Sequence, residues 1–439
     1  MSDTSLDWDD VALEDLGEIV AGGTPSRAVP SFWNGDIPWV TPTEITSLKG
    51  KYLRETRECI TREGLSGSAA RLLPEGALLI TSRATLGEVA IAGVPVATNQ
   101  GFKSIVPNEA TDSLFAYYRI GSLKREMERL ASGTTFLEIS KADFSRIRTL
   151  RPKPAEQAGI AVVLDMMDEA IAKTEAVIAK LKQVRAGLLH DLLTRGLDKH
   201  GQFRDPIAHP EQFKDSPLGR IPNKWDVGPF REFACPDRPY LKTGPFGSSL
   251  KQEHWVPEGV PVVTIGSLGE GEFIQSELLH ISKETARSLS AYALIPGDIV
   301  FSRVADVGRS VVVSEAESGW IMSSNMMWIS LDRDEVEPAY LQLNLATNAA
   351  VRTQISRLVN AGGRDVANAA VMNSLILPWA PIEEQRSIMV TIRSLESRID
   401  SEEAEQHKSH LLRQGLMSDL LTGRVRVAEG VYPPGRKTP

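Results

Sequence analysis

Side chains that could perform chemistry occur in this 439-residue chain, but their spacing does not assemble an active site. Neither a Gly-x-x-x-x-Gly-Lys-Ser/Thr loop for a nucleotide nor a Gly-x-Ser-x-Gly turn for a serine nucleophile is present. The usual Asn-Pro-Pro-aromatic motif of adenine methylation is absent, and Pro236-Asp237 lacks the downstream Asp/Glu-x-Lys of a nuclease. His407 and His410 lack a third metal ligand, so we interpret them as solvent-facing.

The most informative pattern is an internal repeat. Residues 156–194 align with residues 384–422 without a gap, at a constant offset of 228, and 15 of the 39 positions are identical. Both copies begin with Glu-Gln and end with Asp-Leu-Leu-Thr. A repeat of this length predicts two copies of one structural unit, and therefore a molecule with internal pseudo-symmetry that is suited to a two-ended ligand.

Each copy is predicted to be a long helix. In the first copy, apolar residues recur at steps of three and four from Ile160 to Leu192, as in a coiled coil. The second copy keeps this register at its ends, but polar residues take four core positions in its middle: Glu402, Gln406, Ser409 and Arg413. Pro154 and Pro381 suit a first helical turn, and Gly196 and Gly423 suit left-handed helix stops. Two such helices are expected to pack antiparallel as a rigid spacer.

A stretch of short β-like runs, punctuated by Gly and Pro, precedes each helix. The run from Leu73 to Arg83 parallels the run from Ile295 to Arg303. We therefore predict an α+β protein with two pseudo-symmetric α/β domains separated by two long antiparallel coiled-coil helices. The expected segments are domain one at 1–153, helix one at 154–196, a linker at 197–214, domain two at 215–380, helix two at 381–424 and a tail at 425–439.

Composition favours an intracellular protein. Only two cysteines are present, no signal-peptide pattern begins the chain, and no apolar run is long enough for a membrane helix, so we expect a cytoplasmic location. The net charge of −8 depends largely on seven acidic residues among the first 20. A basic run remains in which Asp143 is the single acid, with Lys141, Arg146, Arg148, Arg151 and Lys153 as its cations. Such a run indicates either a nucleic-acid surface or an ordinary solvated face.

Together these features resemble the specificity subunit of type I restriction-modification systems. The resemblance rests on the two helix signatures, on the run from Phe213 to Gly219 with Ile221-Pro222 and Trp225, and on the run from Thr243 to Ser248. It implies that both domains are target recognition domains, each reading half of a bipartite, asymmetric site on double-stranded DNA. It also implies that the helices dock modification subunits, two in number, and that restriction subunits cut the DNA.

The resemblance further implies that the chain is not catalytic and holds no cofactor itself, with S-adenosylmethionine, ATP and Mg on the partner subunits. Polar and basic loop residues are then the candidates for DNA contact. These are Thr24, Ser26, Arg83, Thr134, Thr135 and Lys141 in the first domain, and Lys242, Ser248, Ser249, Arg303 and Arg364 in the second. Arg83 and Arg303 correspond in the two runs, which fits a buried structural salt bridge equally well.

Three other interpretations stay open from the sequence. The chain could serve a fused methyltransferase-nuclease, which the neighbouring genes would reveal. It could be a non-catalytic coiled-coil adaptor, which sequence-specific DNA binding of the assembled complex would exclude. It could also be a self-sufficient enzyme with degenerate motifs, and a cofactor-binding assay on the isolated chain would test that.

The repeat yields a prediction about spacing. Inserting one heptad into both helices, near Lys180 and Lys408, preserves the apolar register and adds roughly 10 Å of helix. At about 3.4 Å per base pair, the gap between the two half-sites should lengthen by at most about three pairs, with both half-site sequences unchanged. Methylation mapping on a library of varied gaps measures this. An unaltered gap preference in an active double-insertion variant would show that the helices do not set the spacing.

Overall fold

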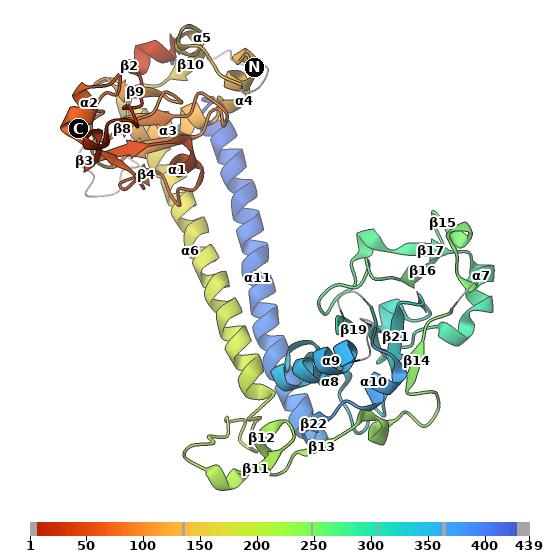
Figure 1. Cartoon of the computed structure of the whole chain (residues 1–439). Helices are drawn as coiled ribbons and strands as arrows, with labels where there is room; N and C mark the ends of the chain where they lie inside the picture. Colours follow the sequence, from red (N-terminus) through yellow and green to blue (C-terminus); the bar gives the residue numbers. More distant parts are fainter. Residues whose placement is uncertain (1–6, 134–136, 247–248, 305–306, 362–365, 428–439) are drawn as a thin grey trace. The chain divides into compact units, whose positions relative to one another are not determined.

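The computed structural model describes residues 7–133, 137–246, 249–304, 307–361 and 366–427 (Figure 1). The chain divides into two compact units. Unit 1 combines residues 1–176 with residues 404–439, and unit 2 comprises residues 177–403. Both boundaries fall inside the two long helices, so each unit contains one compact domain and a part of each helix.

The domain of unit 1 contains two small sheets and a two-stranded ladder. The larger sheet has the order β2-β9-β6-β7-β4, with strands Gly17–Ala21, Lys103–Pro107, Leu78–Ile80, Val89–Ala92 and Tyr52–Leu53. The smaller has the order β5-β3-β8, with strands Cys59–Ile60, Trp33–Val40 and Ala97–Thr98, and β3 and β8 are parallel. The ladder pairs β1 (Asp9–Ala12) with β10 (Arg148–Arg151). Five short helices complete the domain: α1 Pro42–Thr46, α2 Arg62–Ser66, α3 Ser113–Gly121, α4 Lys124–Leu130 and α5 Lys141–Arg146.

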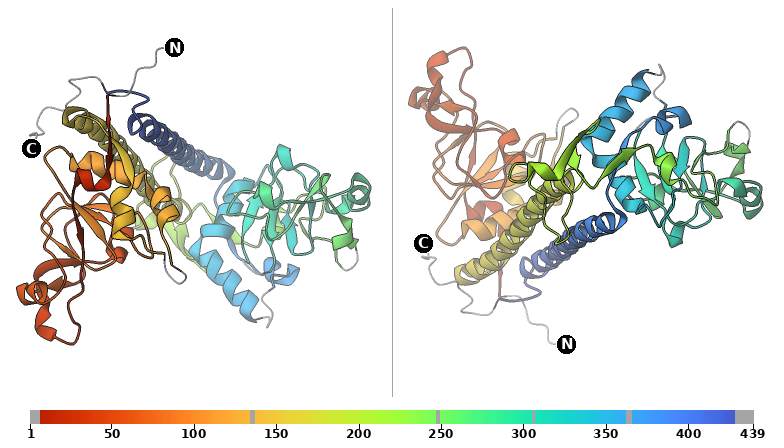
Figure 2. Two further views of the ribbon diagram at one scale, coloured as in Figure 1. Left: turned by 90° about the horizontal axis from the view of Figure 1, so that it is seen from above. Right: turned by 90° about the horizontal axis from the view of Figure 1, so that it is seen from below.

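Unit 2 repeats this topology. Its strands and helices are coloured from green to blue in the two views of Figure 2. The order β14-β21-β18-β19 corresponds to β2-β9-β6-β7, with strands Leu241–Thr243, Met326–Ile329, Ile299–Ser302 and Ser310–Val312. The second sheet, β15-β17-β16-β20, has strands Trp255–Val256, Leu279–Ile281, Val260–Val263 and Ile321–Met322, and β16 and β20 are parallel as β3 and β8 are. A ladder again pairs β13 (Asp226–Gly228) with β22 (Leu377–Trp379). The helices are α7 Lys283–Ser288, α8 Pro338–Thr347, α9 Ala349–Ala361 and α10 Ala369–Asn373, and β11 (Phe213–Ser216) and β12 (Gly219–Pro222) form a hairpin. The predicted mixed fold with two domains of one kind is confirmed.

The two long helices are α6 (Pro154–Leu192) and α11 (Ile382–Leu420), each of 39 residues. Gly196 and Gly423 follow them in left-handed conformation, with φ of 61° and 73°, as the sequence predicts. The placement of Pro381 in the first turn is wrong. Pro381 precedes the helix as its cap, and its carbonyl accepts the N–H groups of Glu384 and Gln385 at 2.8 and 3.0 Å. No helix within the described ranges is both long and apolar enough to cross a membrane.

The long helices run antiparallel within each unit. In unit 2, the Arg185 guanidinium lies 2.5 Å from a carboxylate oxygen of Glu396, and Lys182 pairs with Glu403 at 2.7 Å. In unit 1, Asp168 of α6 pairs with Arg413 of α11, and the Gln406 amide donates to Glu175 at 3.2 Å. In both units the residue number on α11 falls as the number on α6 rises, which requires an antiparallel pair.

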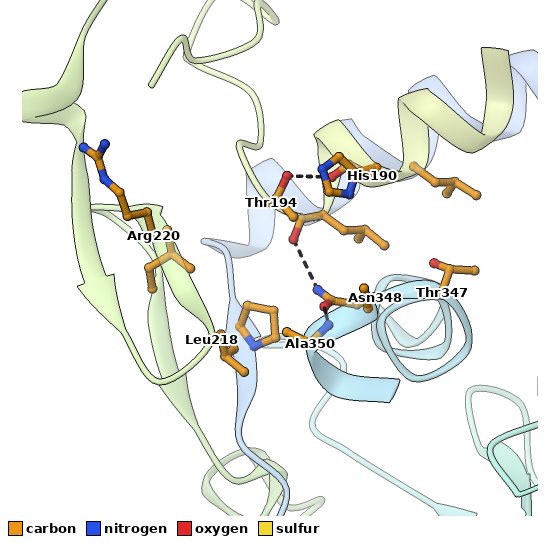
Figure 3. Close-up of a pocket in the computed structure, with 12 residues that line it drawn as sticks. His190, Thr194, Leu218, Arg220, Thr347, Asn348 and Ala350 are labelled. Carbon is orange, nitrogen blue, oxygen red and sulfur yellow. Dashed lines mark hydrogen bonds between the residues drawn. The ribbon is translucent and has the colours of Figure 1, made fainter. Parts of the chain in front are cut away.

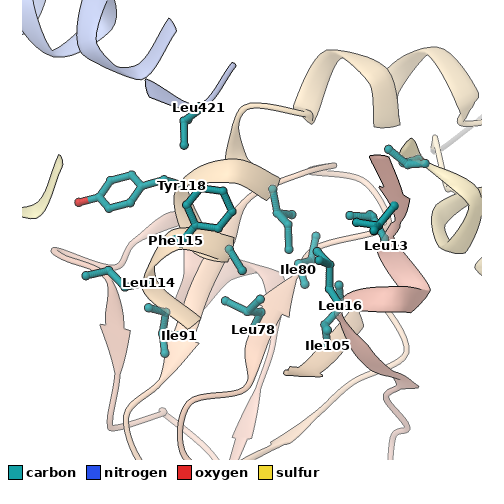
Figure 4. Close-up of a cluster of buried hydrophobic side chains, with 14 of the residues drawn as sticks. Leu13, Leu16, Leu78, Ile80, Ile91, Ile105, Leu114, Phe115, Tyr118 and Leu421 are labelled. Atoms are coloured by element: carbon teal, nitrogen blue, oxygen red, sulfur yellow. The ribbon is translucent and has the colours of Figure 1, made fainter. Parts of the chain in front are cut away.

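The leucines at the end of each long helix pack against the domain from the other half of the sequence. Leu421, directly after α11, is 1% exposed and packs with Tyr118 in the core of unit 1 (Figure 4). Leu192 and Leu193 of α6 are likewise buried, and they pack in the core of unit 2 with Trp225. Burying one such side chain stabilises a fold by about 1.5–3 kcal/mol, so the repeated Leu-Leu pair is a docking element.

The repeated glutamine at the start of each long helix anchors the helix to a domain. Gln157 and Gln385 are 0% and 1% exposed. The side-chain oxygen of Gln157 accepts the N–H of Asp112 at 2.8 Å, and that of Gln385 accepts the N–H of Glu337 at 2.9 Å. Each amide group also donates to backbone carbonyls of its own domain. A buried amide with all its partners satisfied fixes one orientation, so each glutamine ties a helix start to the adjacent domain.

The polar core positions predicted for α11 are confirmed as half-buried, and Arg413 joins a charged cluster in unit 1. Asp168 accepts hydrogen bonds from Arg413, from Tyr118 at 2.7 Å and from Lys51, whose Nζ also lies 2.9 Å from Asp165. Burial alone would raise the pKa of Asp168, but hydrogen bonds from its three partners outweigh that effect and lower the pKa. The polar core of α11 therefore depends on ionised partners rather than on apolar contact.

This cluster predicts a pH-dependent stability. Asp168→Asn should destabilise unit 1 by about 1–3 kcal/mol near pH 7, because it removes the partly buried carboxylate that pairs with both Arg413 and Lys51 and leaves Lys51 with Asp165. Since the folded pKa of Asp168 is lowered, its contribution is complete above its ordinary value of about 3.9 and is lost as the pH falls through the folded value. The penalty should therefore shrink below about pH 4.

Amide hydrogen exchange of unit 1 between pH 3 and 8, corrected for the intrinsic exchange rate, measures this penalty. Glu169→Gln is the matched control, because Glu169 is an exposed neighbour on α6 whose partner is Lys173, one turn along. A penalty that is independent of pH, or equal for the two variants, would contradict the role of Asp168.

Candidate nucleic-acid interface

The loop between β2 and β3 of unit 1 presents Thr24 and Ser26, and both are exposed. The loop is held by close backbone contact, since a Cβ atom on Gly22 would lie 1.9 Å from the carbonyl oxygen of Asn99. The Thr24 hydroxyl donates to the side-chain oxygen of Gln100, which is also exposed. The glycines thus fix the path of a loop whose polar side chains are free to meet a ligand.

Arg27 on the same loop was not predicted from the sequence. Its guanidinium stacks over Trp33 at 3.8 Å from the ring centroid, and it forms a bidentate ion pair with Glu58. The hydrogen bond to Arg27 lowers the pKa of Glu58. An exposed arginine held flat on an aromatic ring is suited to stacking or to bidentate hydrogen bonding. The signal in the sequence, an isolated Arg before a tryptophan-rich strand, is too weak to identify it.

Arg83 is exposed, and its Nε lies 3.7 Å from Glu138. Lys103 on β9 is 7% exposed, and its Nζ lies 3.7 Å from Glu138 and 3.3 Å from the hydroxyl of Ser82. Backbone β-bridges pair Glu138 with Arg83 and with Ser132, so the two ends of the 132–138 loop lie beside Arg83. Thr134 and Thr135 lie on that loop but outside the described residues. The structure therefore brings Arg83 together with the ends of the predicted threonine loop, around a buried lysine that the sequence did not single out.

The basic run before α6, in which Asp143 is the single acid, is largely neutralised by acids from outside the run. The β1–β10 ladder places the acidic N-terminal strand directly beside it. Three ion pairs result, from Arg148 to Asp10 at 3.2 Å, from Arg151 to Asp9 at 3.4 Å and from Lys153 to Asp7 at 3.1 Å. The partners are more than 130 residues apart in sequence, so a local charge count could not reveal the pairing.

Lys141 remains available at the first position of α5. It is exposed, and it has no ion pair or hydrogen bond within the described part of the chain. The helix start is fixed by Ser140, whose hydroxyl oxygen accepts the N–H of Asp143 at 3.0 Å. An unpaired lysine on a fixed helix start can contact a phosphate without first breaking an internal ion pair.

Two of the predicted residues of unit 2 have internal structural contacts. Lys242 lies over the ring of Tyr292 at 4.5 Å from its centroid, and its ammonium group donates to a backbone carbonyl. Arg303 is 9% exposed and donates to the carbonyls of Ala367 at 3.2 Å and Ser324 at 3.0 Å. Burial lowers the pKa of Arg303. Arg303 therefore holds two loops together, whereas its counterpart Arg83 is exposed.

The structure places one of the three remaining predicted residues of unit 2. Ser249 is exposed, and Ser248 and Arg364 lie outside the described residues. The ion pair of Arg83 with Glu138 is exposed and 3.7 Å long, so it is not the buried salt bridge considered from the sequence.

A cavity of about 210 Å³ lies in unit 2 between the end of α6, β12 and the start of α9 (Figure 3). Leucine, isoleucine, proline and alanine side chains form much of its wall, with His190 and Arg220 near its rim. Asn348 fixes the wall by donating to the carbonyl of Leu193 at 3.3 Å and accepting the N–H of Ala350 at 3.1 Å. The lining contains no Asp or Glu, and the Thr194 hydroxyl donates to the backbone carbonyl of His190 at 2.6 Å rather than to a base. Within the described residues, no group of three metal-binding side chains occurs.

Comparison with protein families identifies both halves of the chain. A family model described as the type I restriction modification DNA specificity domain matches residues 5–183 and 245–409. The MjaIX specificity subunit of Methanocaldococcus jannaschii is 35% identical over 167 residues, which is 38% of this chain and 39% of that protein. The MjaVIII specificity subunit of the same organism is 20% identical over 431 residues, covering 96% of this chain and 93% of that protein.

Solved structures show the same fold. The type I restriction-modification S subunit of M. genitalium superposes with a TM-score of 0.53 at 15% identity, covering 96% of this chain and 98% of that one. The HsdS subunit of Thermoanaerobacter tengcongensis gives a TM-score of 0.51 at 15% identity, again over 96% and 98%.

The family model matches both recognition domains and much of both long helices, as the duplicated topology requires. The resemblance drawn from the helix signatures is therefore confirmed, and this chain belongs to the family of type I restriction-modification DNA specificity proteins.

Proposed function

We propose that this chain selects the DNA sequence for a type I restriction-modification complex, with each recognition domain reading one half of a bipartite, asymmetric site. The observation that carries the proposal is the duplication of one domain topology, matched on both sides by the family model. The fold repeats, yet side chains at corresponding positions are presented differently, since Arg83 is exposed and Arg303 is buried. Different side chains on one frame read different bases, because sequence choice depends on contacts to base edges.

We further propose that the paired long helices dock two modification subunits. Val184 and Leu412 occupy equivalent positions in the repeat and are 45% and 53% exposed. Equivalent exposed apolar side chains on the two helices support two docking surfaces of one kind. In this proposal the modification subunits carry S-adenosylmethionine, the restriction subunits use ATP and Mg, and this chain catalyses nothing itself. The missing nucleotide and methylation motifs support that division of labour.

The first test exchanges one recognition domain. Replacing residues 1–153 by the corresponding segment of a relative with a different target should change one half-site and leave the other intact, because the two domains have separate cores and most residues of the first core lie within 1–153. Methylation sequencing of cells that carry the hybrid complex measures both half-sites at once. A change in both half-sites would contradict two independent readers, and an unchanged pattern would favour a coiled-coil adaptor.

The second test concerns phosphate contact by Lys141. Lys141→Ala should reduce the slope of log affinity against log salt concentration by about 0.9, the value for one phosphate contact, without changing the preferred sequence. Arg148→Ala is the matched control, because Arg148 is already paired with Asp10 at 3.2 Å and should alter the slope less. The measurement is a salt titration of DNA binding by the assembled complex. A slope in the Lys141 variant equal to that of the unmodified complex would exclude the contact.

A further inference from the structure

A buried carboxylate at the start of α11 receives three groups of donors in unit 2. Glu384 accepts the indole N–H of Trp225 at 3.0 Å and the backbone N–H of Leu197 at 3.0 Å. It also forms a bidentate pair with Arg204 at 2.6 and 2.8 Å, in which both side chains are about one-tenth exposed. A Cβ atom on Gly196 would lie 2.2 Å from this carboxylate, so glycine is required there. We call Trp225, Glu384 and Arg204 the second clasp.

The same chemistry recurs in unit 1 at the start of α6. Glu156, the repeat equivalent of Glu384, accepts the indole N–H of Trp8 at 3.0 Å. It also forms a bidentate pair with Arg426, with Nη2 at 2.8 Å from Oε2. Val427, the next residue, packs on the core of unit 1 and against Gly159 of α6. We call Trp8, Glu156 and Arg426 the first clasp.

The two arginines are not equivalent in the repeat, because they lie at different distances after the two long helices. Arg204 lies in the segment that follows α6, and Arg426 lies in the shorter segment that follows α11. Each clasp therefore attaches one recognition domain to a segment from the other half of the sequence. That segment is the one that follows the long helix of the other half. Removing one partner of a buried charge pair leaves the other charge without compensation, which is why both sites need the arginine.

The clasps differ in exposure, and this makes the first one the weaker of the two. The Arg426 side chain is 50% exposed and Glu156 is 12% exposed, against 9% and 10% for Arg204 and Glu384. Solvent and salt screen an exposed pair more than a buried one. Trp8 leads directly into β1, and β10 is its single ladder partner within the described part of the chain. Loosening Trp8 should therefore loosen the β1–β10 ladder that ends just before α6.

We propose that Arg426 is a positioning residue for the first recognition domain, through its hold on Glu156 and Trp8 and thereby on the β1–β10 ladder. The segment after the second helix would then control how faithfully the domain at the other end of the chain reads its half-site. This inference rests on the proposed role of residues 1–153 as a DNA reader.

The test uses the full chain, assembled with its partner subunits, and the variant Arg426→Ala. Amide hydrogen exchange in residues 9–12 and 148–151 should accelerate about tenfold, since a charge-assisted bidentate contact is lost. Exchange in residues 226–228 and 377–379 should stay unchanged. Methylation across a DNA library randomised in each half-site should lose discrimination in the half-site assigned to residues 1–153, and retain it in the other.

Arg424→Ala is the matched control, because Arg424 lies on the same segment, pairs with Asp419 at 2.8 Å and does not contact Glu156. Arg426→Lys, which keeps the charge but loses the bidentate geometry, should restore part of the discrimination. Unchanged exchange in Arg426→Ala, or an equal effect of Arg424→Ala, would overturn the inference. Faster exchange with both half-sites read as before would overturn the positioning role, while the domain exchange described above decides separately whether residues 1–153 read DNA.

Discussion

Each recognition domain packs against leucines from the other half of the sequence. Leu420 and Leu421, at the end of α11, belong to the core cluster of unit 1, and Leu192 and Leu193, at the end of α6, belong to a buried cluster of unit 2 that includes Trp225. Each pair lies at the end of a helix that starts beside the other domain. Because large apolar side chains must be buried, the antiparallel pairing of the helices and the completion of the two cores depend on each other. The Asp-Leu-Leu-Thr signature repeats for this reason, and no chemistry is needed to explain it.

The constant frame explains which residues diverge between the halves. Glutamates, glutamines and leucines that attach helix to domain keep their identity, since each has several partners that a substitution would leave unsatisfied. Residues on the loops have no such restraint. Arg83 and Arg303 are aligned in the sequence, yet one is exposed beside Glu138 and the other is buried against backbone carbonyls. Alignment of the two halves therefore locates the residues that attach the helices to the domains. It does not identify the side chains that read bases.

The elements that could be predicted from the sequence are those whose signal is periodic or repeated. The long helices, their glycine stops and the polar positions of α11 follow from heptad spacing and from the offset of 228. The pairing of Asp9 and Asp10 with β10 could not be predicted, because a ladder between strands so far apart leaves no local pattern. Lys103, Arg27 and the first clasp were missed for a related reason. Each gains its role from partners that only the folded chain brings together.

The pairing of the acidic N-terminal strand also reconciles a net charge of −8 with a DNA-binding role. The acids at positions 7, 9 and 10 each face a cation from the run before α6, so those charges cancel over a few ångströms. A phosphate responds mainly to charges within a screening length of about 8 Å at physiological salt, and hardly to the sum over the molecule. Within the described residues, Lys141 and Arg146 have no ion pair, and Arg83 has only an exposed, long one. The acidic N-terminal residues thus pair three cations of the run, and the exposed Lys141, Arg146 and Arg83 remain the better candidates for contact with the DNA backbone.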